Sequence, residues 1–131
     1  DLTLSIRVGP IKYPFSELGL APEVGSSYLL FQALGYQQAA QLLFQSKIID
    51  GTKYYELGLA KYVGDDFLDQ AYSYARDLKE QSLSSIIETK AILKSFMLED
   101  LAKARSMETK AMKKLFGSED NLKAVEKFFN K

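Results

Sequence analysis

The stretch PFSELGLAPEVGSSYLL, from Pro14 to Leu30, places two glutamates among apolar residues, glycines and prolines. Glu17 and Glu23 are six positions apart, so they do not share the spacing of three or four residues that joins neighbours on a helix. The LGLAP between them contains a glycine and a proline, which favour a loop. The segment is therefore predicted to be a loop that leads into a helix.

The residues alone leave two interpretations of these glutamates open. Acidic residues just before a helix, or in its first turn, complement the positive end of the helix dipole, which is a purely structural role. A carboxyl group held among Phe15, Leu20 and Tyr28 would instead have a raised pKa and would exchange protons with a carbon acid. The local pattern does not choose between the two.

Composition restricts the available chemistry. The chain has 131 residues, 47% of them hydrophobic, which suits one ordinary domain with a real core. It contains no cysteine and no histidine, so no metal site or Ser-His-Asp triad is expected, and acid–base catalysis must use carboxylates, lysines or tyrosines. Lys plus Arg and Asp plus Glu are balanced at 17 each, which gives no reason to expect nucleic acid or a membrane surface as a partner.

The pattern along the chain predicts a few strands first and helices afterwards. Extended pieces are expected at residues 2–8, 11–15 and 60–63. Helices are expected at residues 28–34, 36–46, 51–59, 67–78, 83–97, 98–115 and 122–129, with caps at Ser26 or Ser27, Asp50 and Ser82 or Ser84, and with Gly35 as a break. So few strands do not form a stable sheet alone, and the chain opens on one without an initiator Met, so we expect a fragment.

The helix expected from Leu98 to Leu115 carries two apolar stripes. One stripe is formed by Leu98, Leu101, Ala102 and Arg105, and the other by Ala104, Met107, Ala111 and Leu115. A helix with two such stripes usually packs against two surfaces, because a large apolar stripe exposed on a monomer favours association. We therefore expect this helix to contact both its own domain and a second copy of the chain.

Three segments together resemble the enoyl-CoA hydratase/isomerase (crotonase) superfamily, nearest its peroxisomal-type isomerases that convert 3-enoyl-CoA to 2-enoyl-CoA. They are PFSELGLAPEVGSSYLL, LGYQQAAQLLFQSKIIDGTKYYELGLAKYV and the terminal SEDNLKAVEKFFNK, while DLTLSI is similar to a strand of the family. The resemblance implies an α/β fold, the ClpP/crotonase spiral of ββα units, here its C-terminal part. Residues 1–66 would complete the core, and residues 67–131 would form a helical region for trimerisation and a lid over the CoA pocket.

The resemblance also implies a reaction. Glu23 falls where the peroxisomal-type isomerases keep their single catalytic acid, and Glu17 where the hydratases keep the second of two. One base suffices for isomerisation, because it removes a proton from C2 of a 3-enoyl thioester and returns it at C4. The backbone N–H groups that hold the dienolate oxygen in this family would lie upstream of Asp1, so the fragment alone is predicted to be inactive.

Further binding residues follow from the same resemblance. Phe15, Leu20, Tyr28 and Phe31 are candidates for an acyl tunnel, with simple core packing as the alternative for each. Lys127 and Lys131 match the region where family members contact CoA, often in an adjacent subunit. No cofactor is expected, since coenzyme A is part of the substrate, and the expected partners are further copies in a homotrimer or a dimer of trimers.

Two other functions stay open: a 2-enoyl-CoA hydratase that uses Glu17, and a noncatalytic crotonase-like domain that binds acyl-CoA or another protein. Val24 stands where a small residue is frequent in the family, which is expected to narrow the space beside Glu23. No apolar run approaches the roughly 20 residues that span a bilayer, and no signal peptide is visible, so we expect a cytoplasmic protein. A peroxisomal location is the alternative, although the terminal FFNK is not a Ser-Lys-Leu address.

Overall fold

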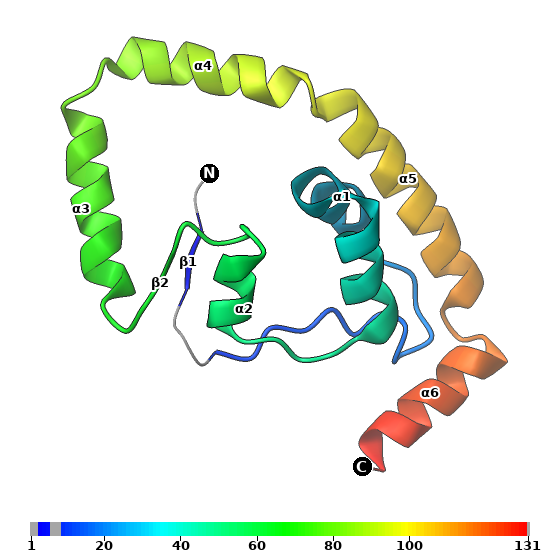
Figure 1. The fold of residues 1–131 in the computed structure, drawn as a ribbon. Helices are drawn as coiled ribbons and strands as arrows, with labels where there is room; N and C mark the ends of the chain where they lie inside the picture. Colours follow the sequence, from blue (N-terminus) through cyan, green and yellow to red (C-terminus); the bar gives the residue numbers. More distant parts are fainter. Residues whose placement is uncertain (1–2, 6–8, 131) are drawn as a thin grey trace. The chain divides into compact units, whose positions relative to one another are not determined.

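A computed structural model describes residues 3–5 and 9–130 of the chain (Figure 1). Their elements, in order, are strand β1 (Leu4–Ser5), helices α1 (Ser26–Gln45) and α2 (Gly51–Glu56), strand β2 (Tyr62–Val63), and helices α3 (Phe67–Lys79), α4 (Leu83–Ser95), α5 (Leu98–Leu115) and α6 (Glu119–Phe129). This part of the chain is therefore mostly helical. None of the helices in it has both the length and the apolar character needed to cross a membrane.

The described residues form two compact units, and each is discontinuous in sequence. The first contains the chain up to Ile11 together with Ile49–Glu99. The second contains Lys12–Ile48 and the chain from Asp100 onward. The second unit holds both glutamates of the opening loop, whereas the expected division into residues 1–66 and 67–131 stays a prediction about a longer domain.

In the first unit, β1 and β2 lie side by side and pair in parallel, with Leu4 opposite Tyr62 (Figure 1). The strand expected at residues 2–8 is confirmed at Leu4–Ser5, and the rest of it lies outside the described residues. A strand at 11–15 is wrong, because only Ile11 pairs, in an antiparallel bridge with Ile49. Pro14 lacks the N–H that a ladder requires, and the chain turns directly after it.

Both ends of helix α2 are determined by residues next to it in the sequence. The Asp50 side chain accepts a hydrogen bond from the Lys53 N–H at 2.8 Å, which confirms the expected cap. The helix stops at Glu56 rather than at residue 59, because Gly58 adopts a positive φ of 76° that ends helical geometry. The following strand β2 is half-buried rather than buried, while Ala60 before it is buried.

Helices α3 and α4 bury none of their own residues in this chain. Ser82 caps α4 as expected, but α4 ends at Ser95, so Met97 lies beyond it. Large apolar side chains are exposed along both helices and at the start of α5: Leu68, Tyr72, Leu83, Ile87, Ile92, Leu93, Phe96 and Leu98. Such a set of exposed apolar groups indicates a surface that something else covers.

In the second unit, α1 bends at Gly35, whose φ of 71° and ψ of 171° are not helical. This confirms the expected break between two helical segments. The side chains that α1 buries are Leu30, Ala39 and Leu43. Tyr36 and Phe44, expected on the same buried face, are 65% and 69% exposed, because the face that this unit covers is narrower than the sequence pattern suggests.

Within this chain, helix α5 packs through one face, and the expected contact with a second copy stays a prediction. Its least exposed side chains lie along a single face, at spacings of three and four residues: Leu101, Ala104, Glu108, Ala111, Met112 and Leu115. This face takes residues from both expected stripes, whereas Met107, assigned to the second stripe, is 63% exposed. A charged residue, Glu108, stands in the middle of the packed face and is only 6% exposed.

Helix α6 is tied to the opening loop by Asn121, which is 4% exposed. Its Nδ2 donates to the Leu18 carbonyl at 2.6 Å, and its Oδ1 accepts from the Gly117 N–H at 2.9 Å. Gly19 lies so close that a Cβ there would come within 2.9 Å of the Asn121 Cα. The loop and the start of α6 are therefore in direct contact.

We expect Asn121→Ala to destabilise the intact protein by about 1–2 kcal/mol, because the half-buried Leu18 carbonyl and the Gly117 N–H would lose their hydrogen-bond partners. Chemical denaturation measures this change. Asn130→Ala at the exposed end of α6 is the control and should change the free energy of unfolding by less than about 0.5 kcal/mol. Equal effects of the two variants would contradict the assignment.

Candidate active site

The loop from Lys12 to Gly25 carries both candidate acids, and contacts at three points hold it within the second unit. It contacts the C-terminal end of α1 through Ser16, helix α6 through Leu18, and helix α5 through Gly25. Hydrogen bonds to three separate helices give this loop a defined shape. The positions of Glu17 and Glu23 therefore follow from these contacts.

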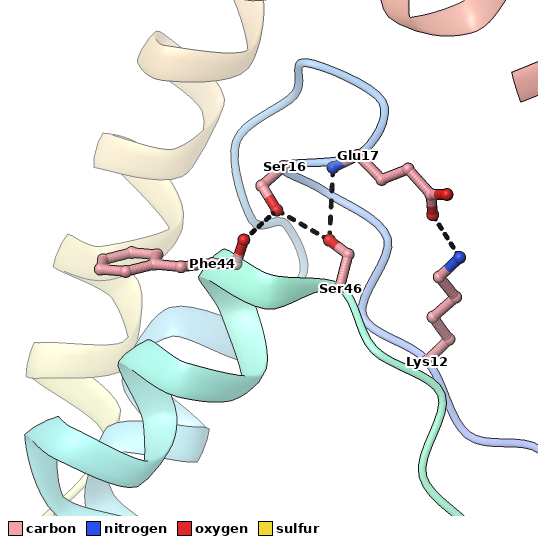
Figure 2. A network of polar contacts seen from close by, with 5 residues as sticks. All are labelled: Lys12, Ser16, Glu17, Phe44 and Ser46. Atoms are coloured by element: carbon pink, nitrogen blue, oxygen red, sulfur yellow. Dashed lines mark hydrogen bonds and ion pairs between the residues drawn. The ribbon is translucent and has the colours of Figure 1, made fainter. Parts of the chain in front are cut away.

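The first contact is a hydroxyl pair at the end of α1, shown in Figure 2. Ser16 Oγ donates to the Phe44 carbonyl at 2.7 Å and lies 2.8 Å from Ser46 Oγ. Ser46 is buried and left-handed, with a φ of 49°, and its hydroxyl accepts from the Glu17 N–H at 3.3 Å. The backbone of Glu17 is thus held against the last turn of α1.

The Glu17 side chain points away from this hydroxyl pair, toward Lys12 (Figure 2). Its carboxylate forms an ion pair with the Lys12 Nζ, and both side chains are partly buried, at 22% and 27% exposure. Lys12 Nζ also lies 5.9 Å from the centre of the Phe128 ring. Glu17 is therefore a fixed, charged side chain with a defined partner.

The second set of contacts centres on Glu108 and the N-terminus of α1. Gly25 is the residue that precedes the first helical residue, and it has no side chain to cap the helix. Glu108, which lies on α5, caps the helix instead. Its Oε2 accepts from the Gly25 N–H at 2.7 Å, and its Oε1 accepts from the Ser27 N–H at 2.9 Å and the Ser27 hydroxyl at 2.5 Å.

This arrangement corrects the expected serine caps. Ser27 does contribute its hydroxyl, but to Glu108, and Ser26 Oγ donates back to the Glu23 carbonyl at 2.7 Å. No acidic residue lies in the first turn of α1. The positive end of the helix dipole is therefore complemented by a carboxylate that comes from more than 80 residues further along the chain.

The backbone beside Glu23 is left-handed at two successive residues. Val24 has a φ of 60° and Gly25 a φ of 82°. Glycine suits this conformation, and a Cβ at residue 25 would come so close to Leu101 Cδ1 that the Leu101 side chain would have to shift. Val24 is different, because a branched residue in this conformation is strained.

Glu23 itself is exposed within this chain, so the apolar surroundings of the second interpretation are not found at this residue. The close contact with α5 is made by the backbone of Gly25, and this leaves the Glu23 side chain outside the packed region. Within residues 3–5 and 9–130, its carboxylate takes part in no hydrogen bond or ion pair. Its backbone carbonyl, in contrast, accepts from both the N–H and the hydroxyl of Ser26.

Glu23 lines a cavity of about 270 Å³ between its turn and α5. The other lining residues are Val24, Arg105, Glu108, Thr109, Met112 and Lys113. The lining thus includes two acidic side chains, Glu23 and Glu108, and two basic ones, Arg105 and Lys113. Val24 and Met112 form its apolar part. Within the described part of the chain, no three carboxylates gather closely enough to hold a metal ion.

The predicted binding residues lie elsewhere. Phe15, Leu20 and Tyr28 are half-buried, Phe31 is exposed, and none of the four lines this cavity. Tyr28 accepts a hydrogen bond from Gln32 through its hydroxyl. Lys127 is exposed on α6, and Lys131 lies outside the described residues. An acyl tunnel and a CoA contact at these positions stay predictions.

Glu108 was not among the residues predicted from the sequence, although a signal for it was present. Leu101, Ala104, Ala111 and Leu115 predict a packed face, and residue 108 lies on that face. A glutamate there has to find donors, because a buried carboxylate without partners is strongly unfavourable. The spacing therefore indicates a buried acid, but it does not indicate which N–H groups the acid binds.

We expect Val24→Gly to stabilise the intact protein by up to about 1 kcal/mol, because relief of the left-handed strain exceeds the entropy cost of glycine. Val24 is 75% exposed, so little packing is lost. Thermal unfolding measures the change, and Val24→Ala, which keeps the Cβ, is the control. If alanine raised the melting temperature as much as glycine, strain at residue 24 would not be the cause.

Comparison with known proteins identifies relatives over the whole chain. No family model matches it. YhaR of Bacillus subtilis, named as an enoyl-CoA hydratase/isomerase, is 27% identical over 133 aligned residues, which cover 100% of this chain and 52% of YhaR. This chain therefore spans about half the length of the curated relatives that it matches.

Solved structures match equally completely. An enoyl-CoA hydratase/isomerase from Pseudoalteromonas atlantica superposes with a TM-score of 0.90 at 23% identity, over 99% of this chain and 53% of that protein. OdaA of Pseudomonas aeruginosa gives a TM-score of 0.89 at 30% identity, over 100% of this chain and 54% of OdaA. In sequence and in fold, this chain is therefore similar to the C-terminal half of an enoyl-CoA hydratase/isomerase (crotonase) domain.

Proposed function

We propose that the protein containing this chain is an acyl-CoA isomerase, which moves a double bond from the 3- to the 2-position of an enoyl-CoA. Glu23 would carry the proton. The finer assignment to a 3,2-isomerase goes beyond the family and rests on this residue. Coenzyme A would enter only as part of the substrate.

One observation supports this role most strongly. An acid just before a helix is ordinarily explained as a cap, but the N-terminus of α1 already has Glu108 as its anion. Glu23 therefore has no structural task within the described residues, and its carboxylate lines a cavity. A carboxylate that is neither a cap nor an ion-pair partner is available for chemistry.

The proposed reaction needs one proton shuttle. The Glu23 carboxylate would remove a proton from C2 of the 3-enoyl thioester, and the electrons would spread over C2, C4 and the thioester oxygen as a dienolate. The resulting carboxylic acid would then return the proton at C4, which restores the carboxylate and leaves a 2-enoyl thioester. Backbone N–H groups in the half of the domain that this chain does not span would hold the dienolate oxygen.

A 2-enoyl-CoA hydratase is the second candidate, and the geometry of Glu17 favours it. Glu17 is partly buried, its N–H is held by Ser46, and its carboxylate is oriented by Lys12. Hydration requires a water to be activated and the α-carbon to be protonated, which takes a second acid. That acid would again come from the other half of the domain.

We expect Glu23→Gln in the intact protein to lower kcat for a 3-enoyl-CoA by about 10²–10⁴-fold, because glutamine cannot shuttle a proton. Formation of the conjugated 2-enoyl thioester can be followed by its ultraviolet absorbance. Glu17→Gln is the paired variant and should leave isomerisation within about tenfold. Full isomerase activity in Glu23→Gln would rule out the shuttle.

Hydration of a 2-enoyl-CoA, measured on the same two variants, separates the candidates. A hydratase would lose activity with Glu17→Gln, whereas the proposed isomerase would show little hydration in any form. A protein that binds acyl-CoA but turns over neither substrate would be the noncatalytic domain. Each result identifies one of the three functions.

We further propose that copies of the protein associate as a homotrimer through the exposed apolar groups of the C-terminal helices. Met107 supports this, because it is 63% exposed on α5 while Ala111, on the packed face, is half-buried. Met107 therefore tests association better than Ala111, whose replacement would also disturb the unit itself.

We expect Met107→Glu to shift the intact protein from trimer toward monomer in analytical ultracentrifugation, because a charge would be buried at the interface. Lys103→Gln, an exposed position on the same helix with the same change in net charge, should leave the mass unchanged. If Met107→Glu stays trimeric, the interface lies elsewhere.

A further inference from the structure

We infer that Glu108 is a positioning residue for Glu23: its carboxylate fixes the turn from Glu23 to Ser27 and so determines where the Glu23 side chain points. This inference rests on the proposed function of Glu23. Glu108 itself is only 6% exposed and its carboxylate is bound to Gly25 and Ser27, so no step of the reaction is assigned to it.

The hydrogen bonds of Glu108 connect α5 to this turn alone. Gly25 and Ser27 together supply three donors to its two carboxylate oxygens, at 2.5–2.9 Å. Bonds between a carboxylate and N–H groups are stronger than bonds between neutral groups. Gly25 is the last residue of the loop and Ser27 lies in the first turn of α1. The carboxylate therefore fixes the backbone on both sides of the point where the helix begins.

A second set of bonds transmits this constraint to Glu23. The Glu23 carbonyl accepts from the Ser26 N–H at 3.0 Å and from the Ser26 hydroxyl at 2.7 Å. Ser26 lies between the two residues that Glu108 holds. The backbone of Glu23 is therefore coupled to Glu108 through one residue.

The backbone conformation shows why the turn needs an external anchor. Val24 is held in a left-handed conformation that a branched residue avoids, and such strain persists only where surrounding contacts over-determine it. Gly25 offers no side-chain cap, and the first turn of α1 contains no acid. Within the described residues, Glu108 is the group that supplies the missing acceptor atoms.

Replacement of Glu108 by glutamine tests this geometry without a change of shape. The amide keeps one acceptor oxygen and replaces the other by an NH₂ group, which is a donor. That NH₂ would face either the Gly25 N–H or the donors of Ser27, so one end of the turn would be released. Ser27→Ala is the milder variant, because it removes only the hydroxyl bond and keeps both N–H groups on Glu108.

The experiment measures kcat and KM of the intact protein with a 3-enoyl-CoA, below the melting temperature of every variant. Glu108→Gln is expected to lower kcat by about 10–100-fold with KM within about twofold, because a misplaced shuttle weakens only the transition state. Ser27→Ala should lower kcat by a few-fold. Glu119→Gln, which removes an exposed carboxylate on α6, is the control and should leave both constants unchanged.

A second readout does not depend on activity. Hydrogen exchange at the Gly25 and Ser27 amides should be at least about tenfold faster in Glu108→Gln than in the unmodified protein, while amides in the middle of α1 keep their rates. If Glu108→Gln lowers the melting temperature but its folded molecules keep the full kcat, Glu108 is only structural and the inference is overturned. Unchanged exchange at Gly25 overturns it as well.

If the proposed function of Glu23 is wrong, the variants give a different set of results than if only the positioning role of Glu108 is wrong. If Glu23→Gln keeps full activity, Glu23 is not the shuttle, and faster exchange at Gly25 in Glu108→Gln then shows a cap with no part in catalysis. If Glu23→Gln is inactive and Glu108→Gln keeps kcat, the shuttle stands and the positioning role falls. The two proposals are thus tested separately.

Discussion

The carboxylate of Glu108, placed against the first N–H groups of α1, is the contact on which the geometry of the candidate site depends. A helix that begins at Gly25 has no side-chain cap of its own, and its unpaired N–H groups have to find acceptors. Because α5 supplies them, the glutamate in the loop is left without a capping role. Because Glu108 caps α1, the carboxylate of Glu23 is available for the proposed reaction.

The two candidate acids differ in the way they are held. Glu17 is partly buried, ion-paired with Lys12 and fixed through its backbone by Ser46, whereas Glu23 is exposed and lines a cavity. The two functions proposed for the family member correspond to these two environments. Both residues are glutamates of the same loop, so their different environments arise from the contacts that hold the loop and not from the type of side chain.

Much of the local structure could be predicted from the sequence. The correct predictions include the break at Gly35, the caps at Asp50 and Ser82, and the bounds of α5. Each of these features depends on residues close together in the sequence, so a sequence pattern can predict it. The expected burial of Tyr36 and Phe44 failed, because burial depends on which neighbours cover a face. The partners of Glu108 could not be predicted either, since no local pattern joins residues 81 to 83 positions apart.

The sequence distances of these anchors also have a consequence for synthesis on the ribosome. Glu108 and Asn121, which hold the loop that carries both glutamates, are translated 83 and 103 residues after the loop positions that they bind. The loop therefore reaches its final form late, after most of the described chain has left the exit tunnel. Until then, the hydrogen bonds that define the positions of Glu17 and Glu23 are incomplete.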